Sequence, residues 1–434
     1  MNDRFLLQGK IPVWVDNGTT VPVLDVLISI GAGSAHDPKG LAGVAMLSAR
    51  MLRRGLRGMS GNAFEKQVAM LGAQVQCAQD GHSTTIHVRC VARNARPTIA
   101  LVSEMLTRPS FDEEQLRILV GEAKSELEFA RENVDYLSHR VLQREMFGDH
   151  PDGAAVHGTM TSLGKITAED LRAFHRQRYV SGNMAMAFAG QCTTAEAEEL
   201  AETIVSKLAN ENAEAIRVEP LAYATPKVVV VHQEGRQQVR MLLGASVDTS
   251  SIRRHASTMI VNNALGGIGA SLLRQAIREE GQMSYMAGSN ITMERSGGLL
   301  FVSSEPNADA LSECITTVMG LLGQIRAGEL DRDLVDVARV NYVNGHAFDI
   351  ETAQDRIGRI MTEHDLGIES RFFDASMGWA GHAQHEAICE HAAASFAGTS
   401  TPCIVLVGDA SRMGGVFEAL DWERNDVRQN DVDN

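Results

Sequence analysis

The feature that most constrains the fold of this chain is an internal repetition of secondary structure. The second half repeats the order of strand-like and helix-like segments found in the first half. Each half ends its repeat with a short apolar strand that runs into a glycine, at residues 185–190 and 403–408. Two copies of one α+β unit are the simplest account of this order.

The length of 434 residues exceeds what one hydrophobic core normally holds, so at least two domains are expected. The segment 209–226 is polar and contains prolines, as is typical of a linker. We therefore predict an N-terminal domain over residues 1–208 and a C-terminal domain over residues 227–434. Each should contain a mixed or antiparallel β-sheet packed with helices.

Local patterns give more detailed expectations for four segments. Segments 11–17 and 23–31 have apolar residues at strand spacing, and Asn17-Gly18 between them predicts a turn that pairs them directly. One long helix is expected from about residue 112 to residue 147. The acidic tail after Asp421 is expected to fray.

The composition excludes several classes of protein. A net charge of -15 argues against a nucleic-acid-binding protein and disfavours contact with anionic membranes. No apolar run of 18 residues is present, and the start of the chain lacks the apolar core of a signal peptide. We expect a cytoplasmic protein, or a periplasmic one if an export signal has been removed. The six cysteines are scattered and predict no disulfide framework.

The stretch from Asp37 to Gly55 predicts an amphipathic helix. Asp37-Pro38 is typical of a turn, and the residues that follow it are strong helix formers. Val44, Leu47 and Met51 recur at helical spacing and would form one buried face, and Gly55 would stop the helix.

This helix resembles the first helix of the pitrilysin/insulinase-type zinc peptidases, the inverzincins. Their H-x-x-E-H motif lies between a Gly-Leu-Ala-like lead and a Met-Leu-x-x-Gly tail. Here the lead begins at Gly43 and the tail ends at Gly55, so the three motif positions hold Met46, Ala49 and Arg50. Neither a histidine ligand nor the general base is present.

The resemblance extends over nearly the whole chain and depends on the order and spacing of several short motifs. In the first half these are Thr107-Arg108-Pro109-Ser110-Phe111, His150-Pro151, Gly158-Thr159, Ile166-Thr167, Asp170-Leu171, Phe174, Tyr179, Asn183-Met184 and Gly190. The resemblance implies an α+β fold of two tandem homologous domains that form half of a clam-shaped chamber.

The resemblance also implies that Glu126 stands where active members carry a third zinc ligand. One carboxylate cannot hold a catalytic zinc, which needs three protein ligands, so no metal is expected in this chain. We hypothesise that Arg50 supplies a positive charge in place of the metal and neutralises Glu126 in the interior. Alternatively, both are ordinary charges on helix surfaces.

A second set of motifs resembles the substrate-binding region of the family. Leu265-Gly266-Gly267, the helix that ends near Gly281, and Met283-Ser284-Tyr285 follow one another as in the family. The resemblance implies that Arg278 and Tyr285 bind the substrate backbone and stabilise an oxyanion in the partner's active site. Alternatively, Arg278 caps its helix and Tyr285 fills the sheet. Gly266 and Gly267 would move with the substrate, or form a plain turn between helices.

Taken as a whole, the resemblance implies a non-catalytic subunit of a heterodimeric zinc metallopeptidase. The alpha subunit of mitochondrial processing peptidase and bacterial two-subunit homologues are similar. A homologous partner would bind the zinc, this chain alone would have no activity, and the substrates would be unfolded or small peptides. Two alternatives stay open: a catalytically dead scaffold or peptide-binding protein, and a subunit that processes the precursor peptide of a cofactor such as pyrroloquinoline quinone.

Overall fold

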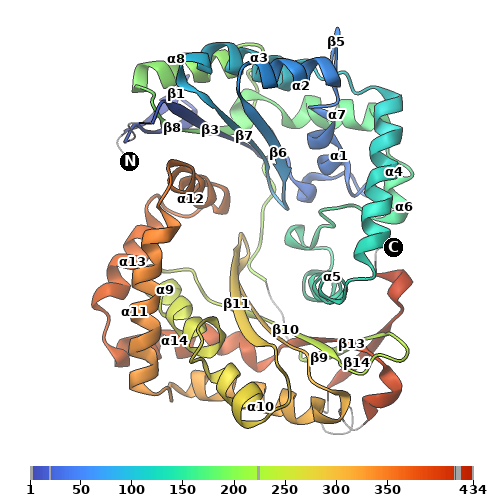
Figure 1. Cartoon of the computed structure of the whole chain (residues 1–434), viewed down its shortest axis with the longest axis vertical. Coiled ribbons are helices and arrows are strands. Elements are labelled where there is room, and N and C mark those ends of the chain that lie inside the picture. Colours follow the sequence, from blue (N-terminus) through green and yellow to red (C-terminus); the bar gives the residue numbers. More distant parts are fainter. Residues whose placement is uncertain (1–2, 19–20, 222–224, 415, 417–421, 433–434) are drawn as a thin grey trace. The chain divides into compact units, whose positions relative to one another are not determined.

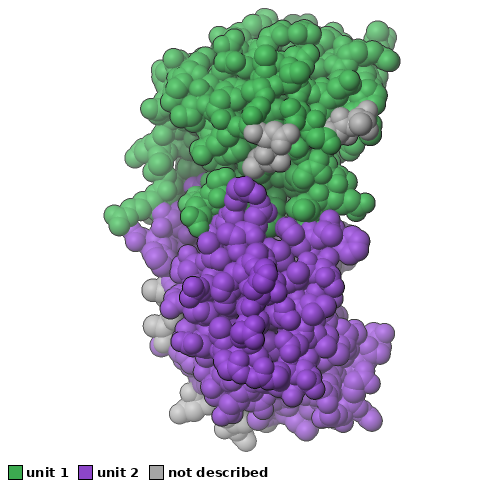
Figure 2. Space-filling view, turned by 90° about the vertical axis from the view of Figure 1, so that its left-hand side faces the viewer, with its two compact units in different colours: residues 1–127, 154–217, 349–370 green, residues 128–153, 218–348, 371–434 purple. Residues whose placement is uncertain are grey.

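The computed structural model describes residues 3–18, 21–221, 225–414, 416 and 422–432. They form two compact units that are interleaved in the sequence (Figure 2). Unit 1 contains residues 1–127, 154–217 and 349–370, and unit 2 contains residues 128–153, 218–348 and 371–434. The chain passes between units after residue 217, within the expected linker, but it also crosses at four further points, after residues 127, 153, 348 and 370. The units therefore differ from the two contiguous domains predicted above.

Most described strands of unit 1 form one sheet with a strand from the end of the first repeat at its centre, and β4 (Gly55–Leu56) and β5 (Met59–Ser60) form a separate two-stranded sheet. The order of the larger sheet is β1 (Asp3–Leu7), β2 (Ile11–Asp16), β8 (Met184–Gly190), β3 (Val23–Ile30), β7 (Thr84–Val91) and β6 (Gln74–Gln79). β2 and β8 are parallel, and the other neighbours are antiparallel. The prediction that β2 and β3 pair directly is wrong. β8 lies between them because all seven of its residues are apolar or glycine and fully buried.

The helices of unit 1 include one from the second half of the chain. They are α1 (Val44–Met51), α2 (Gly61–Met70), α3 (Ala95–Thr107), most of α4 (Glu113–Ala130), α6 (Met160–Leu163), α7 (Ala168–Arg178), α8 (Thr194–Val205) and α12 (Ala353–Leu366). Figure 1 shows α3 and α8 on one face of the sheet and α12 on the other. Ile357, Ile360 and Met361 of α12 pack against alanines of β8, whose small side chains leave room for the helix.

The sheet of unit 2 repeats the order of five of these strands, β2-β8-β3-β7-β6, and differs in the remaining edge strand. Its described order is β11 (Ala287–Glu294), β12 (Gly297–Ser304), β10 (Arg240–Val247), β13 (Cys403–Gly408), β9 (Lys227–His232) and β14 (Glu423–Val427). β13 lies between β9 and β10 as β8 lies between β2 and β3, so the predicted correspondence of the two closing strands is confirmed. The acidic tail does not fray as expected, because β14 pairs in parallel with β9 and Val432 is buried in the core.

Unit 2 likewise contains a helix from the first half. Its described helices are α5 (Val134–Phe147), α9 (Ile252–Asn262), α10 (Leu311–Ala327), α11 (Arg332–Asp349), α13 (Phe372–His382), α14 (His385–Ser395) and two π-helical stretches, Asn263–Gly267 and Arg274–Glu280. In Figure 1, α5 lies on one face of the sheet, and α9, α10 and α14 lie on the other. A Cβ atom on Gly244 of β10 would come within 2.7 Å of Leu142 and Met146, so a glycine there lets α5 approach the sheet.

The single long helix expected over residues 112–147 is two helices. The break lies at residues 131–133, and the side chain of Asn133 accepts hydrogen bonds from the amides of Asp135 (2.8 Å) and Tyr136 (3.3 Å). This N-cap starts α5, which continues into unit 2. The overall class is the mixed α+β fold that the sequence predicted. None of the described helices combines the length and apolarity needed to cross a lipid bilayer.

Candidate functional site

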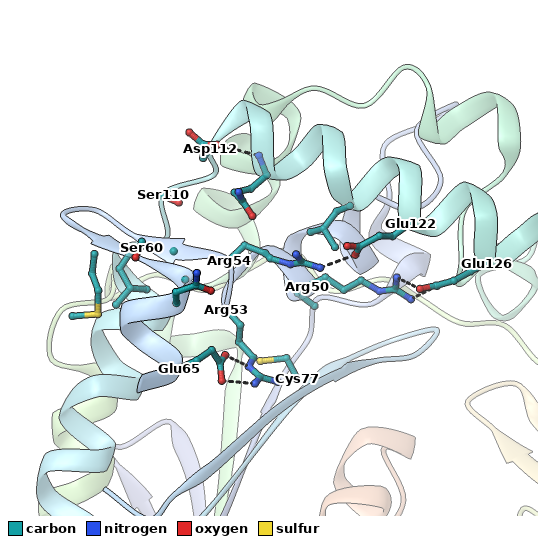
Figure 3. Close-up of a pocket in the computed structure, with 18 residues that line it drawn as sticks. Arg50, Arg53, Arg54, Ser60, Glu65, Cys77, Ser110, Asp112, Glu122 and Glu126 are labelled. Carbon is teal, nitrogen blue, oxygen red and sulfur yellow. Dashed lines mark hydrogen bonds and ion pairs between the residues drawn. The ribbon is translucent and has the colours of Figure 1, made fainter. Parts of the chain in front are cut away.

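A pocket of about 900 Å³ lies in unit 1 at the end of α1 (Figure 3). Its walls come from α1 and the turn after it, from α2, from α4 and from the strand β6. The charged side chains that line it are Arg50, Arg53, Arg54, Glu65, Asp112, Glu122 and Glu126. The pocket is therefore lined by two of the three degenerate motif positions, Ala49 and Arg50, and by Glu126.

Helix α1 is anchored at its start by a carboxylate. The two oxygens of Asp37 accept hydrogen bonds from the backbone amides of Gly43 (2.6 Å) and Ala45 (2.7 Å). Burial raises the pKa of Asp37 to about 7, although both backbone hydrogen bonds lower it. Gly43 has a φ of 103°, which favours glycine, and a Cβ there would come within 2.9 Å of Leu163. Every residue of α1 except Arg50 is buried.

The three motif positions differ in their surroundings. Met46 is buried in the core and Ala49 lines the pocket. Arg50 binds Glu126 through two hydrogen bonds, Nη1 to Oε1 at 3.1 Å and Nη2 to Oε2 at 2.8 Å. The hypothesis that Arg50 and Glu126 pair is confirmed. Their placement in the interior is wrong, because their side chains are 30% and 58% exposed. The pair faces the pocket because the buried face of α1 is already apolar.

Two further ion pairs line the same pocket. Arg53 makes two hydrogen bonds with Glu65 of α2, at 3.0 and 2.9 Å. Arg54 binds Glu122 of α4 at 2.6 Å. Arg50 and Arg54 are four residues apart, as are their partners on α4, so two parallel ion pairs join the same segments. These two pairs were not predicted from the sequence, although the matched spacing of opposite charges indicates the pair of Arg54 and Glu122.

The side chains of this pocket do not fit a zinc ion. A zinc site needs histidine, cysteine or carboxylate donors, and the motif positions with Glu126 offer a single carboxylate. That carboxylate is bound by a guanidinium, which stays protonated in proteins. Within the described ranges, no cluster of three or more histidine, cysteine, aspartate or glutamate side chains is placed to hold a metal ion.

An open strand edge borders the pocket. β6 pairs with β7 on one side and is the last strand of the described sheet on the other. Cys77 of β6 lines the pocket, and burial raises the pKa of its thiol to about 12. The thiol is therefore not a nucleophile at neutral pH. The edge offers backbone groups that an extended peptide could pair with.

Arg278 and Tyr285 lie next to each other in unit 2. The guanidinium carbon of Arg278 is 4.3 Å from the centroid of the Tyr285 ring, a cation–π contact. The Tyr285 residue is 80% exposed, so it does not fill the sheet. Arg278 lies in the last turn of a π-helical stretch, and its Nε lies 3.5 Å from Oε1 of Glu279. The structure thus brings the two predicted residues together on the surface, and their role in substrate binding stays a prediction.

Gly266 and Gly267 belong to the first π-helical stretch of unit 2. A Cβ on Gly266 would lie 2.2 Å from the backbone nitrogen of Ser289 in β11, so only glycine allows this close approach. A Cβ on Gly267 would lie 2.6 Å from Oδ1 of Asn263. Packing against the edge strand β11 explains Gly266, and the close approach of Asn263 explains Gly267, without a substrate. Their substrate-binding role also stays a prediction.

Comparisons with known proteins agree with these observations. The family model described as Insulinase (Peptidase family M16) matches residues 13–160, and the model described as Peptidase M16 inactive domain matches residues 165–342. The uncharacterized zinc protease YmxG of Bacillus subtilis is 20% identical over 83% of this chain and 87% of its own length. A probable mitochondrial-processing peptidase subunit beta of Arabidopsis thaliana is 22% identical over 72% of this chain and 61% of its own length.

A solved structure is also similar to this chain. The crystal structure of a peptidase M16 inactive domain from Pseudomonas fluorescens superposes with a TM-score of 0.87 at 20% sequence identity. It covers 94% of this chain, and this chain covers 99% of it. This likeness shows that this chain has the fold of the solved protein.

Proposed function

The chain belongs to the M16 peptidase family, and we propose that it is the non-catalytic, substrate-binding subunit of a heterodimeric zinc peptidase. The observation that carries the proposal is the bidentate pair of Arg50 and Glu126 in the pocket of unit 1. A guanidinium stands where a metal ligand would be needed, so the hydrolytic centre would have to come from another chain.

The exposed pair Arg278–Tyr285 supports a role in substrate binding. A scaffold has no need for an aromatic residue that is 80% exposed and stacked on an arginine. The guanidinium offers a fixed set of donors to a peptide carbonyl, and the phenol hydroxyl can donate to a developing oxyanion. In the proposed complex, this chain binds the substrate backbone and stabilises charge in the partner's active site.

The partner we propose is a homologous subunit that binds zinc. The Arabidopsis relative is named as a probable subunit of a mitochondrial-processing peptidase, which supports an arrangement of several chains. The substrates would be unfolded or small peptides, because these can add a strand to an open sheet edge such as β6. The zinc belongs to the partner in this proposal, and this chain supplies no ligand to it.

Replacing Tyr285 with phenylalanine tests the proposal. Loss of one oxyanion donor typically lowers turnover about 10²–10³-fold, and we expect that loss for Tyr285→Phe in the complex with the zinc-binding partner. Peptide hydrolysis would be measured for each chain alone and for the mixture, and the partner's zinc content should not change. Tyr342→Phe on α11 is the matched control. Normal turnover of the Tyr285→Phe complex would overturn the proposal.

A scaffold or peptide-binding protein is the second candidate function. It is favoured by the pocket of unit 1, where Arg50, Arg53 and Arg54 are all bound by glutamates. Such a protein would bind peptides with an affinity that Tyr285→Phe leaves unchanged, and no partner would make it hydrolytic. Peptide binding measured by fluorescence anisotropy, together with the hydrolysis assay, separates the two functions.

A further inference from the structure

The turn that carries Tyr285 lies between the second π-helical stretch and the strand β11. Tyr285 is 80% exposed, whereas its neighbours Met283 and Ser284 are 8% and 7% exposed. An exposed aromatic side chain gains little orientation from packing. Its direction therefore depends on how firmly the backbone of the turn is held.

The hydroxyl of Ser284 holds the backbone on both sides of Tyr285. It donates to the carbonyl of Met286 (2.8 Å) and accepts from the amides of Met286 (3.2 Å) and Glu305 (3.1 Å). One donated and two accepted bonds use the full capacity of a hydroxyl. The fully buried Ser304 of β12 donates to the same Met286 carbonyl at 2.9 Å. The turn is thus tied to the end of β12.

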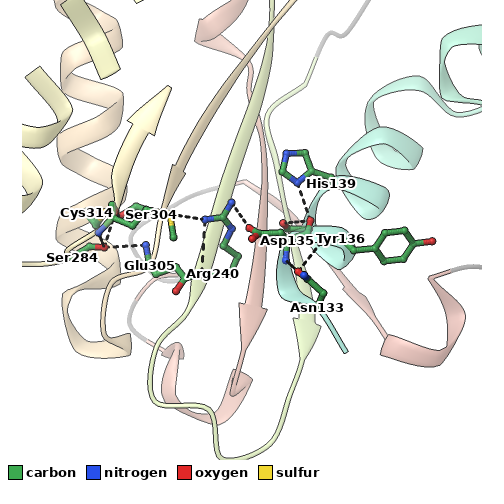
Figure 4. Close-up of polar contacts among 11 residues, drawn as sticks. Asn133, Asp135, Tyr136, His139, Arg240, Ser284, Ser304, Glu305 and Cys314 are labelled. Atoms are coloured by element: carbon green, nitrogen blue, oxygen red, sulfur yellow. Dashed lines mark hydrogen bonds and ion pairs between the residues drawn. The ribbon is translucent and has the colours of Figure 1, made fainter. Parts of the chain in front are cut away.

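A buried arginine extends this network to α5 (Figure 4). Arg240 of β10 is 4% exposed, and its Nη2 lies 2.6 Å from Oδ1 of Asp135 in the first turn of α5. Its Nη1 lies 3.9 Å from Glu305 Oε1 and 3.6 Å from Met286 Sδ. A buried guanidinium is strongly unfavourable without such partners. Three different segments are therefore joined at one side chain.

We propose that Arg240, Ser284 and Ser304 are positioning residues that hold Tyr285 in its stack on Arg278. The inference rests on the proposed function, in which that stack binds the substrate. Asp135 and Glu305 orient the guanidinium, so the helix from the first half of the chain helps to fix the substrate-binding turn. None of these residues would touch the substrate itself.

A spectroscopic measurement on the chain alone tests the positioning without any partner. The protein is labelled with 3-fluorotyrosine, and its Tyr285 resonance in the ¹⁹F NMR spectrum is assigned by its loss in Tyr285→Phe. We expect Ser284→Ala and Arg240→Met to shift and broaden this resonance, because the turn then samples several conformations. Ser257→Ala, at a fully buried serine of α9, and Arg326→Met, at an arginine bound to Thr399, are the matched controls.

Kinetics with the zinc-binding partner provide the second test. Misplacement of a catalytic group by about 1 Å can lower turnover about 10²-fold, so we expect Ser284→Ala to lower kcat about 10- to 100-fold with KM nearly unchanged. In the Tyr285→Phe background the same change should have no further effect, because Ser284 acts through Tyr285.

The two hypotheses fail in different ways. Normal turnover of Tyr285→Phe would contradict the proposed function. The positioning network alone would be overturned by a different result. In that case Tyr285→Phe would lose most of its turnover, whereas Ser284→Ala and Arg240→Met would both keep the ¹⁹F resonance and the kcat of the wild-type chain. Additive losses in the double variant would also overturn it, because they would indicate general destabilisation. If Arg240→Met does not fold, Ser284→Ala decides the outcome.

Discussion

The arginines of the two candidate regions have different partners, and this difference indicates which region can bind a substrate. In the pocket of unit 1, Arg50, Arg53 and Arg54 are each bound by a glutamate. At the turn of unit 2, Arg278 lies under the exposed ring of Tyr285. The first arrangement neutralises charge within the pocket. The second presents a tyrosine hydroxyl to solvent, so the proposed stabilisation of an oxyanion is expected from the turn and not from the paired arginines of the pocket.

The largest effect should come from removing the arginine of the turn. Arg278→Ala deletes both the donors and the support under Tyr285, so we expect turnover with the zinc-binding partner to fall at least about 10²-fold. The comparable change in the pocket, Arg50→Ala, should alter turnover less than about twofold. Peptide hydrolysis assays of both complexes measure the contrast. Equal losses in the two variants would remove the distinction between the regions.

A substitution next to the turn should destabilise unit 2 strongly. In Gly266→Ala the new methyl group would lie 2.2 Å from the backbone of Ser289, which cannot move without disturbing β11. We expect a loss of about 2–3 kcal/mol in the free energy of unfolding. Gly320→Ala in α10 is the control, because no atom lies within 4 Å of its added Cβ and alanine is the better helix former. Urea denaturation of both variants checks the prediction, and equal stabilities would contradict it.

Unit 1 should lose stability in acid through a partly buried histidine. Burial lowers the pKa of His175 to about 4, and its ring donates from Nε2 to the carbonyl of Leu106 at 2.8 Å. The unfolded chain binds the extra proton first, so this contribution is complete above about pH 6.5 and is lost as the pH falls to about 4. His175→Gln does not titrate and should remove roughly 1–3 kcal/mol of this pH dependence.

Urea denaturation at several pH values would measure the difference between the wild-type chain and His175→Gln. The comparison with His175→Gln is needed because the contribution of Asp37 to the free energy of unfolding has the opposite pH dependence. Its pKa is raised to about 7, so its contribution is present in acid and is lost as the pH rises through 7. Parallel pH profiles for the two proteins would show that the His175 ring is not the titrating group.

The smallest effect should come from the ion pair at the degenerate motif. Arg50 and Glu126 are 30% and 58% exposed, so solvent screens their attraction. A double-mutant cycle with Arg50→Ala and Glu126→Ala should give a coupling free energy of about 0.3–1 kcal/mol, which falls in high salt. A coupling several times larger would mean that the pocket pairs are a structural substitute for the metal.

Much of the fold could be predicted from local patterns. The repeat could be predicted because β8 and β13 are short apolar strands that end in glycine. The turn before α1 could be predicted from Asp37-Pro38. The packing of α5 in unit 2 could not be predicted from the sequence, because it depends on contacts between residues that are far apart in the chain, such as Leu142 and Gly244. The N-cap Asn133 was a visible sign of the helix break that the prediction overlooked.

The candidate site was predictable to a different extent in each unit. The pair of Arg50 and Glu126 followed from the resemblance and from charge complementarity, and the contact of Arg278 with Tyr285 agrees with their spacing. Arg240 could not be found in this way. An arginine within a strand gives no sign that it is buried, and its partner Asp135 is more than a hundred residues away in the sequence.

The reciprocal placement of α5 and α12 has a consequence for how the polypeptide acquires its structure. Each half of the chain contributes a 14-residue helix to the hydrophobic core that the other half's sheet builds. A protease that cut within residues 209–226 would leave two fragments, neither of which could complete its own interior. The fragments should regain order only when mixed, so the molecule is expected to assemble as one cooperative event rather than as two successive ones.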